Sequence, residues 1–399
     1  MGNMFRGKRN TKSMVGMATT IIVAFMMVLS FSTGSMASET KPIKVGVVIA
    51  LSGFIASDGQ GCLGAIKLWQ DEINAAGGLL GRKVELIVED SASDPKTANE
   101  KMKRVVAKRP DVCIGPILSA ERSATYPIVV KAGIPFLYFT FYEGGAYDPL
   151  MFITGEVPEQ QTEKFVPWLA EKYGPKFYII GSDYEFPQKS AKVVKKYLAD
   201  AGGQVVGEEL IAMGTTDFSS LITRIRKVKP DVLFSIMVGT DAVAFAKQFN
   251  DYGLKKDIQY ASMVDLETYV DAMGETAAEG NLASFGWFEN LDTPKARAFV
   301  EHYKKLENQR VTTLVEACYA VLQLWTEAVK KEGTTQGEAI KKGMADLTVE
   351  APEGAVTMRA IDNHTARPSY IARVHKGEYQ VIKNFGKVAP GKDQRNPQW

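Results

Sequence analysis

Apolar residues follow two recurring patterns along the chain. Strand-like runs rich in apolar residues, such as IKVGVVIA at 43–50 and KVELIVED at 83–90, are typical of buried β-strands. Between these runs, Leu63, Ile66 and Ile73 are spaced to share one face of a helix. Because strand-like and helix-like segments alternate, the pattern predicts a parallel sheet that helices cover on both faces.

The same alternation starts again near residue 160. The second series has strand-like segments at 176–181, 204–211, 231–238 and 258–262. Each series is about 120 residues long, so we expect two similar α/β lobes.

We therefore predict an α/β fold of two doubly wound parallel-sheet lobes. The helical stretches 294–307 and 313–331 have no strand between them and are expected to return to the first lobe. No low-complexity linker separates the lobes, so three short crossings are expected, near 155–158, 282–286 and 353–356. The expected division is 1–37 for a signal peptide, 38–156 plus 285–354 for the first lobe, 157–284 plus 355–385 for the second lobe and 386–399 for a C-terminal tail.

The first 37 residues have the plan of a secretory signal peptide. A basic segment at 1–12 precedes the apolar stretch Met14–Phe31, and the small residues Ser-Met-Ala follow. Cleavage is expected after about Ala37, so the protein is expected to work outside the cytoplasm. The alternative is an uncleaved membrane anchor, for which the apolar stretch is at the short end of the required length.

Composition excludes several classes of protein. Apolar residues make up 45% and charged residues 24%, which excludes a disordered chain or a multi-pass membrane protein. The net charge is +2, but the predicted signal peptide carries four of the 48 basic residues and none of the 46 acidic ones. The remaining chain is therefore slightly acidic, and no nucleic-acid partner is expected.

Three cysteines, Cys62, Cys113 and Cys318, leave at least one thiol unpaired in an exported protein. The sequence around Cys113 and Cys318 favours buried small hydrophobic residues, and one disulfide of undetermined pairing remains an alternative.

Neither catalysis nor a bound cofactor is indicated. The three histidines lack metal-ligand spacing, and the chain contains no Cys-x-x-Cys pair or G-x-S-x-G motif. Gly59, Gly61 and Gly64 form a G-x-G-x-x-G pattern, but a long loop separates them from the preceding strand, unlike in a dinucleotide site. We expect these glycines to let the backbone approach a ligand or the opposite lobe.

Candidate ligand-binding residues follow the predicted strands. Ligands of parallel sheets bind at the carboxyl ends of the strands, and two such edges facing each other across a hinge form a closing cleft. The candidates at these positions are Ser119, Tyr138, Thr140, Tyr142, Tyr184, Gly239, Thr240 and Asp265. Hydroxyls suit a carbonyl or carboxylate oxygen, an acid suits an amine or amide, and aromatic rings suit an apolar or planar portion. For Ser119 and Thr240, helix capping is the alternative interpretation.

Several motifs resemble those of a known family. FTFYEGG at 139–145, GSDYEFP at 181–187, MVGT at 237–240 and APEGAVTMRAIDNH at 351–364 are similar to the periplasmic solute-binding proteins of ABC importers. The similar branch serves branched-chain amino acids, urea and short-chain amides. The resemblance implies a type I periplasmic binding fold, a membrane permease as partner and no cofactor.

The resemblance also implies roles for the candidate residues. Ser119 and Thr140 would hold an oxygen of the solute, with Tyr138 beside them. From the second lobe, Tyr184 would close over the solute, with Gly239 and Thr240 on the next loop. Asp265 falls near the acid that holds the ammonium group in amino-acid binders, which favours an amine-bearing ligand.

We therefore expect an exported binding protein that captures a small polar solute and delivers it to a permease. One alternative is a sensory module of the same fold that signals to a partner. An exported amide-processing enzyme is the weakest alternative, because no activated nucleophile is visible.

Overall fold

The structure is a computed structural model that describes residues 1, 2, 4 and 41–397. The predicted signal peptide and its cleavage site lie outside the described residues. Residues from Pro42 onward form one compact unit, and everything below concerns this unit.

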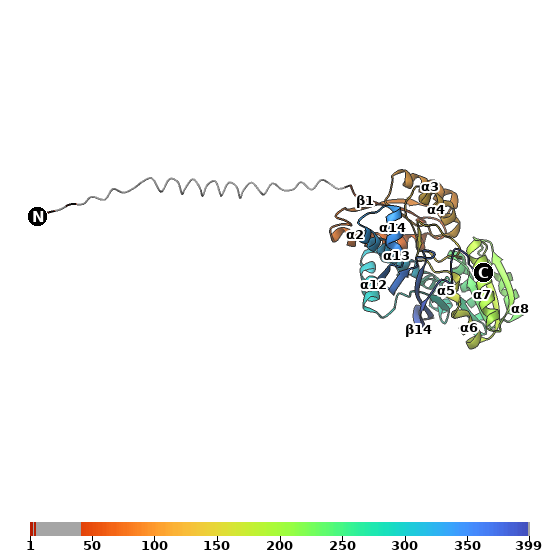
Figure 1. The fold of residues 1–399 in the computed structure, drawn as a ribbon. Helices are drawn as coiled ribbons and strands as arrows, with labels where there is room; N and C mark the ends of the chain where they lie inside the picture. Colours follow the sequence, from red (N-terminus) through yellow and green to blue (C-terminus); the bar gives the residue numbers. More distant parts are fainter. Residues whose placement is uncertain (3, 5–40, 398–399) are drawn as a thin grey trace. The chain divides into compact units, whose positions relative to one another are not determined.

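The first sheet has five parallel strands in the order β2-β1-β3-β4-β5. Its strands are β1 (Ile43–Ile49), β2 (Val84–Asp90), β3 (Val112–Ile114), β4 (Phe136–Tyr138) and β5 (Met151–Ile153). The helices around it are α2 (Ala56–Ala75), α3 (Pro95–Ala107), α4 (Ser119–Lys131), α12 (Pro294–Leu306), α13 (Thr313–Glu332) and α14 (Gly337–Met344). Helices α3 and α4 lie on one side of this sheet, and α2, α13 and α14 lie on the other (Figure 1).

The second sheet has nine strands and is mixed. Strands β6 to β10 are parallel, whereas β11 to β14 continue the sheet in antiparallel pairs. The strands are β6 (Lys176–Ser182), β7 (Gln204–Ile211), β8 (Val232–Ile236), β9 (Gln259–Ser262), β10 (Leu282–Phe285), β11 (Thr348–Ala351), β12 (Gly354–Met358), β13 (Thr365–His375) and β14 (Glu378–Val388). The helices of this lobe are α5 (Pro158–Thr162), α6 (Phe165–Tyr173), α7 (Glu185–Asp200), α8 (Ser219–Val228), α9 (Gly239–Asp251), α10 (Glu267–Met273) and α11 (Glu275–Ala278), with a short 3-10 turn at Leu254–Lys256.

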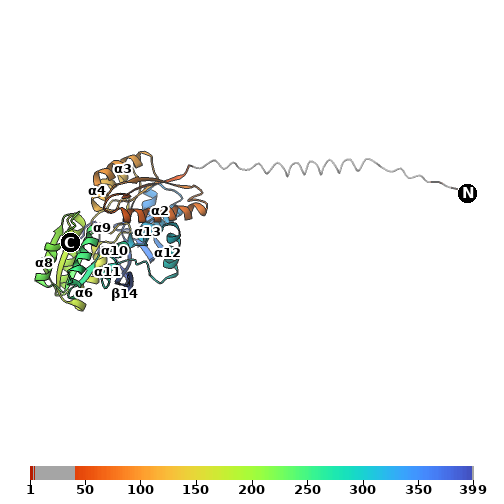
Figure 2. The same ribbon diagram turned by 180° about the vertical axis from the view of Figure 1, so that it is seen from behind.

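Alternate strand residues face two different apolar cores in each lobe. In β6, Phe177 and Ile179 pack toward α6 and α7, whereas Tyr178 and Ile180 pack with residues of α8 and α9. The first sheet is likewise covered on both faces, because β1 contributes Val47 to one core and Val48 to another (Figure 2). Both lobes are therefore doubly wound.

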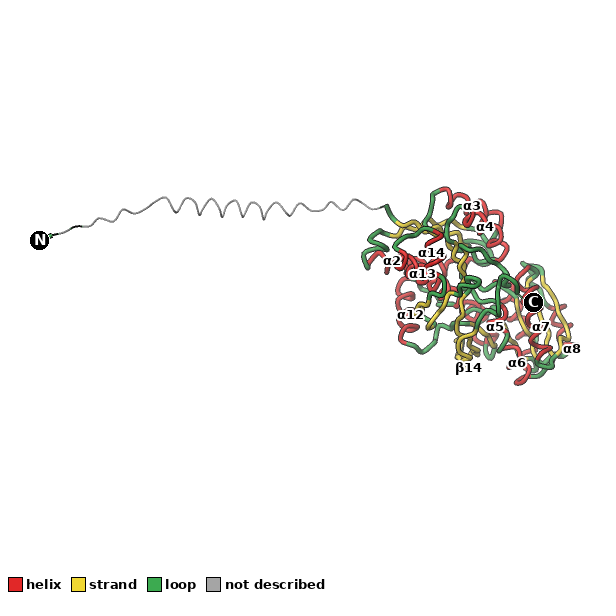
Figure 3. The backbone as a smooth tube through the Cα atoms, in the orientation of Figure 1, coloured by secondary structure: helices red, strands yellow, loops and turns green. Residues whose placement is uncertain are grey.

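The two late helices return to the first lobe, as expected from the sequence. Helix α13 packs along α2, where the indole N–H of Trp69 donates to Thr326 Oγ1 at 2.9 Å. Three segments connect the lobes: 154–157 after β5, 286–293 after β10, and the strands β11 to β13 (Figure 3). The predicted architecture of two doubly wound lobes on a three-crossing hinge is thus confirmed.

Several short elements were not predicted from the sequence. Strands β5 and β10, with three and four residues, escape a pattern that needs a longer apolar run. Two short helices, α5 and α6, precede the first strand of the second series. The three cysteines are buried and none is in a disulfide.

The G-x-G-x-x-G pattern serves helix packing and lies inside α2. A Cβ at Gly59 would be 1.8 Å from the carbonyl oxygen of Ala50, and one at Gly64 would be 2.7 Å from Glu307 Cγ. The glycines thus let α2 approach the end of β1 and the residues that follow α12, both within the first lobe.

We expect Gly59→Ala to destabilise the protein by about 1–3 kcal/mol, because the new methyl group collides with backbone that cannot move away easily. Gly61→Ala is the matched control in the same helix, since its Cβ would meet only the side chain of Val315, at 3.2 Å, and others farther off. Urea unfolding of both variants measures the difference. Equal stability of the two variants would contradict the close approach at Gly59.

Candidate functional site

The first-lobe side of the candidate cleft is built around a buried ion pair. Helix α4 begins at Ser119, and Arg122 lies one turn further on. Arg122 Nη2 is 2.6 Å from Glu143 Oε1, and Ser119 Oγ donates to Glu143 Oε2 at 2.6 Å. All three side chains are buried. Because Ser119 uses its proton on Glu143, its oxygen can only accept from a further partner.

Two tyrosines hold the guanidinium of Arg122 in place. Its central carbon lies 5.3 Å from the ring centroid of Tyr138 and 4.6 Å from that of Tyr142. The hydroxyl of Tyr138 donates to the carbonyl oxygen of Ile117 at 3.0 Å. Both tyrosines are fully buried and belong to the core of the first lobe.

The hydroxyl of Tyr142 is hydrogen-bonded to His364. Burial lowers the pKa of His364 to about 4, despite the nearby Asp362, so its ring is neutral at pH 7. Nδ1 lies 2.7 Å from the carbonyl oxygen of Asp362, which only accepts, so Nδ1 carries the proton. Nε2 therefore accepts from the Tyr142 hydroxyl, 2.5 Å away.

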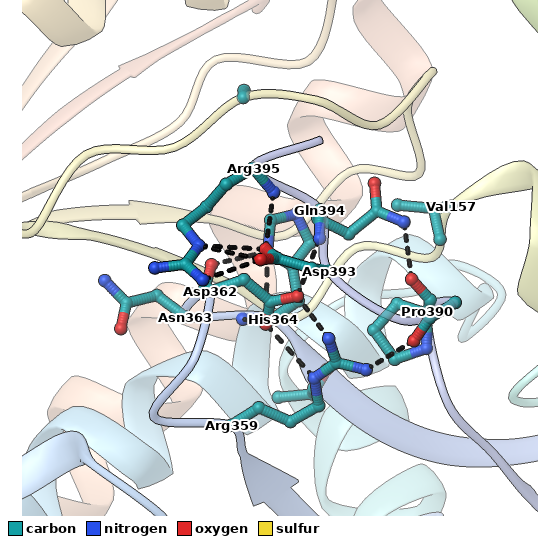
Figure 4. Close-up of polar contacts among 12 residues, drawn as sticks. Val157, Arg359, Asp362, Asn363, His364, Pro390, Asp393, Gln394 and Arg395 are labelled. Atoms are coloured by element: carbon teal, nitrogen blue, oxygen red, sulfur yellow. Dashed lines mark hydrogen bonds and ion pairs between the residues drawn. The ribbon is translucent and has the colours of Figure 1, made fainter. Parts of the chain in front are cut away.

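The C-terminal segment forms hydrogen bonds with Asp362 and Arg359, which lie close to His364 (Figure 4). The carboxylate of Asp362 accepts from the backbone N–H of Gln394 at 2.9 Å and is paired with Arg359. Arg359 also donates to the carbonyl oxygen of Lys392 at 3.0 Å. The tail after β14 is therefore anchored to the turn that positions His364.

Thr140 follows β4 and is buried, yet its hydroxyl has no hydrogen-bond partner within the described part of the chain. A buried hydroxyl without a partner costs free energy, so such a group is a candidate for contact with a bound molecule.

The second lobe contributes Tyr184 at the start of α7. This side chain is half-buried, and the pKa of its hydroxyl is raised well above 10 by burial and then by nearby Tyr138, Glu143 and Asp58. All three neighbours belong to the first lobe. Tyr184 thus faces the group formed by Ser119, Arg122 and Glu143.

A direct hydrogen-bonded bridge connects the lobes at Asp58. The Tyr269 hydroxyl, from α10, donates to Asp58 Oδ2 at 2.9 Å and accepts from the backbone N–H of Gly239 at 2.9 Å. Burial raises the pKa of Asp58 to about 6, while the hydrogen bonds from Tyr269 and Ser57 partly oppose this rise. Neither Asp58 nor Tyr269 was predicted from the sequence.

Apolar contacts between the lobes surround this bridge. The ring of Phe141 lies 5.6 Å from that of Phe186 at the start of α7. At Gly239, which has a φ of +68°, a Cβ would be 3.3 Å from Phe54. A larger residue would be strained there and would press against Phe54.

The structure places two predicted residues apart from this group. Thr240 is exposed, and its hydroxyl is 3.4 Å from Asp241 Oδ1. Asp265 is buried in the second lobe, and neither of its carboxylate oxygens has a hydrogen-bond partner among the described residues. Burial raises its pKa to about 7 in spite of nearby Ser262, Tyr260 and Lys255. Within the described residues, no cluster of His, Cys, Asp or Glu has the geometry to hold a metal ion.

The comparisons with known proteins identify the family. The family model described as periplasmic binding protein matches residues 42–378. The chain therefore belongs to the periplasmic binding protein family. None of the helices in the described residues is long and apolar enough to cross a membrane.

Characterised relatives are named for amino acids. The chain is 25% identical over 342 residues to the leucine-, isoleucine-, valine-, threonine- and alanine-binding protein of Pseudomonas aeruginosa, which covers 84% of this chain and 89% of the relative. It is 24% identical over 366 residues to the Leu/Ile/Val-binding protein homolog 4 of Brucella abortus, with 86% of each chain covered.

Solved structures show the same fold. A solute-binding protein of an ABC transporter from Rhodopseudomonas palustris, in complex with 3,4-dihydroxybenzoic acid, has a TM-score of 0.80 at 24% identity and covers 88% of this chain and 98% of that one. A branched-chain amino acid transporter substrate-binding protein from Streptococcus pneumoniae, in complex with isoleucine, has a TM-score of 0.78 at 22% identity and covers 87% and 99%. The predicted type I periplasmic binding fold is confirmed.

The bridge at Asp58 generates a pH-dependent prediction. A carboxyl whose pKa is raised in the folded state loses stabilising free energy as the pH rises through that pKa. Asp58→Asn cannot ionise, so we expect its stability relative to the wild type to increase by on the order of 2 kcal/mol between pH 4 and pH 8. Urea unfolding across this pH range measures the difference.

Asp251→Asn, an exposed position at the end of α9, is the matched control and should follow the wild type at every pH. Parallel pH curves for Asp58→Asn and the wild type would contradict the raised pKa.

Proposed function

We propose that this protein is the periplasmic solute-binding component of an ABC importer. It captures a small polar solute, such as an amino acid, urea or a short-chain amide, between its lobes and delivers it to a membrane permease. The observation that carries the proposal is the direct contact of the lobes through Tyr269 and Asp58, and the buried, unpartnered hydroxyl of Thr140 in the first lobe adds support. No chemical step is part of this function.

In this proposal, each lobe supplies one wall of the cleft. Ser119 and Thr140 contact polar atoms of the solute from the first lobe, and Tyr138 acts indirectly by holding Arg122. Tyr184 closes from the second lobe, and Gly239 brings the start of α9 close to Phe54. Asp265 and Asp58 are the two buried acids that would hold an amine or amide of the solute.

The charges of the cleft favour a solute with N–H groups. Asp58 and the Ser119 oxygen are acceptors, so they suit an amine or amide. Arg122 Nη2 is paired with Glu143, whereas Nε and Nη1 are buried and have no hydrogen-bond partner among the described residues, so they suit an oxygen of the solute. We therefore propose a solute that carries both N–H groups and an oxygen, as amides, urea and amino acids do.

The lobe boundaries are part of the proposal. The first lobe comprises 38–156 plus 285–354, and the second comprises 157–284 plus 355–385. Support comes from the packing of α13 on α2 and from the pairing of β13 with β10. An export signal at 1–37, cleaved after about Ala37, is also part of the proposal.

Calorimetry with urea, acetamide, an amino-acid panel and 4-hydroxybenzoate tests the function directly. Binding of an amide, urea or amino acid at a single site, together with a rise in the melting temperature, is the expected result. Failure of every solute to bind would contradict the proposal, and a chemically altered solute would indicate an enzyme instead.

Thr140→Val tests the site. We expect the variant to bind the solute more weakly by about 1–3 kcal/mol, because a buried polar atom of the solute would lose its hydroxyl partner. The dissociation constant from the same calorimetry measures the effect. Thr240→Val is the matched control, since Thr240 is exposed, and should bind as the wild type does. An unchanged constant for Thr140→Val would remove Thr140 from the site.

A further inference from the structure

The three segments that connect the lobes meet at one buried arginine, Arg367 of β13. Its Nη1 donates to the carbonyl oxygen of Thr154 in the first segment at 2.6 Å. Its Nε donates to Glu353 Oε2 in the turn between β11 and β12 at 2.9 Å. In the remaining segment, a Cβ at Gly286 would lie 2.7 Å from Arg367 Nε. The guanidinium thus contacts every crossing between the lobes.

Two carboxyl groups bond to this single guanidinium, and a third is near enough for its charge to act on it. Glu316 of α13 has Oε2 2.7 Å from Arg367 Nη2, Glu353 bonds the same nitrogen, and Glu156 lies on the first connecting segment. All three side chains are at most 4% exposed. In each, Oε1 is buried and has no hydrogen-bond partner among the residues that the structure describes. We call Arg367, Glu156, Glu316 and Glu353 the hinge cluster.

Other groups near the hinge cluster do not balance its charge. Lys387 of β14 is exposed and donates to Thr357 Oγ1 at 3.3 Å, and Tyr370 of β13 is neutral in its ordinary state. Thr313 Oγ1 lies 3.5 Å from Glu156 Oε2 but carries no charge. Three ionised carboxylates would therefore leave two buried negative charges without a counter-charge, which is unfavourable because the charges lose their hydration.

Proton binding relieves this excess charge. Burial raises the pKa of Glu156 to about 7, although Arg367 and the Gly286 N–H oppose the rise. Burial and then the neighbouring Glu353 raise the pKa of Glu316 well above its ordinary value. Burial also raises the pKa of Glu353, despite Arg367. The carboxyls do not form a metal site, since no group of described residues has that geometry.

We propose that the hinge cluster is a proton-binding site that couples cleft closure to pH. Closure takes up protons from water onto the hinge-cluster carboxyls, and opening returns them to water. The reason is that opening moves the three segments relative to Arg367 and lets water solvate the carboxylates. Protons therefore favour the closed form, and its advantage declines as the pH rises through neutrality. This inference rests on the hinge motion of the proposed function.

An interlobe fluorescence transfer experiment on the full chain from residue 38, without any solute, tests the proposal. Dyes are attached at Lys103→Cys on α3 and Lys227→Cys on α8, both exposed, while the native cysteines are buried. For the wild type, we expect the ratio of closed to open molecules to fall by up to about tenfold per pH unit between pH 6.5 and pH 8.5, as one linked proton requires. No change over this range overturns the proposal.

Glu156→Gln and Glu316→Gln resemble the protonated carboxyls, so each variant should fold. We expect each to reduce the pH dependence and the double variant to abolish it. Glu121→Gln is the matched control, because Glu121 is also a buried carboxyl with a raised pKa but lies on α4, away from the hinge. A double variant that retains the wild-type pH dependence overturns the proposal.

The absence of solute separates this test from the calorimetry. Closure that responds to protons in a protein that binds none of the panel solutes would contradict the proposed function and support the proton site. Solute binding together with pH-independent closure would support the proposed function and contradict the proton site.

Discussion

The buried ion pair between Arg122 and Glu143 is the interaction on which the first-lobe wall of the cleft depends. Burial removes both charges from water, and only hydrogen bonds and close contacts around the pair compensate for the lost hydration. The Ser119 hydroxyl and the faces of Tyr138 and Tyr142 supply part of this compensation, whereas Nε and Nη1 of Arg122 have no hydrogen-bond partner among the described residues. Because the two charges cancel, the wall presents little net charge to a solute, and the carboxyl of Asp58 gains influence over which solute is preferred.

The fold was largely predictable because its strands are buried on both faces. Such strands, for example β1 and β6, have continuous apolar sequences that distinguish them from the helices between them. Strands β5 and β10 were missed because three or four residues carry too little pattern. Their positions depend on neighbouring strands of the sheet, and these are contacts that a local pattern does not contain.

The site was predicted less completely, for two physical reasons. Tyr138, Thr140 and Tyr142 are spaced two residues apart, as on one face of a strand, but β4 ends at Tyr138, so this alternation does not continue to Thr140 and Tyr142. His364, which determines the direction of Tyr142, is 222 residues away in the sequence. Asp58 was missed because the glycines around it suggested a loop, whereas α2 already begins at Ala56 and places the carboxyl in its first turn.

The contact between Phe54 and Gly239 has a consequence for the size of the cargo. With no side chain at Gly239, the lobes can approach until the ring of Phe54 meets the backbone of α9. The closeness of this approach sets the smallest volume that the two lobes can enclose. Both lobes can thus contact a molecule of only a few atoms. A larger side chain at position 239 would shift the preference toward larger solutes.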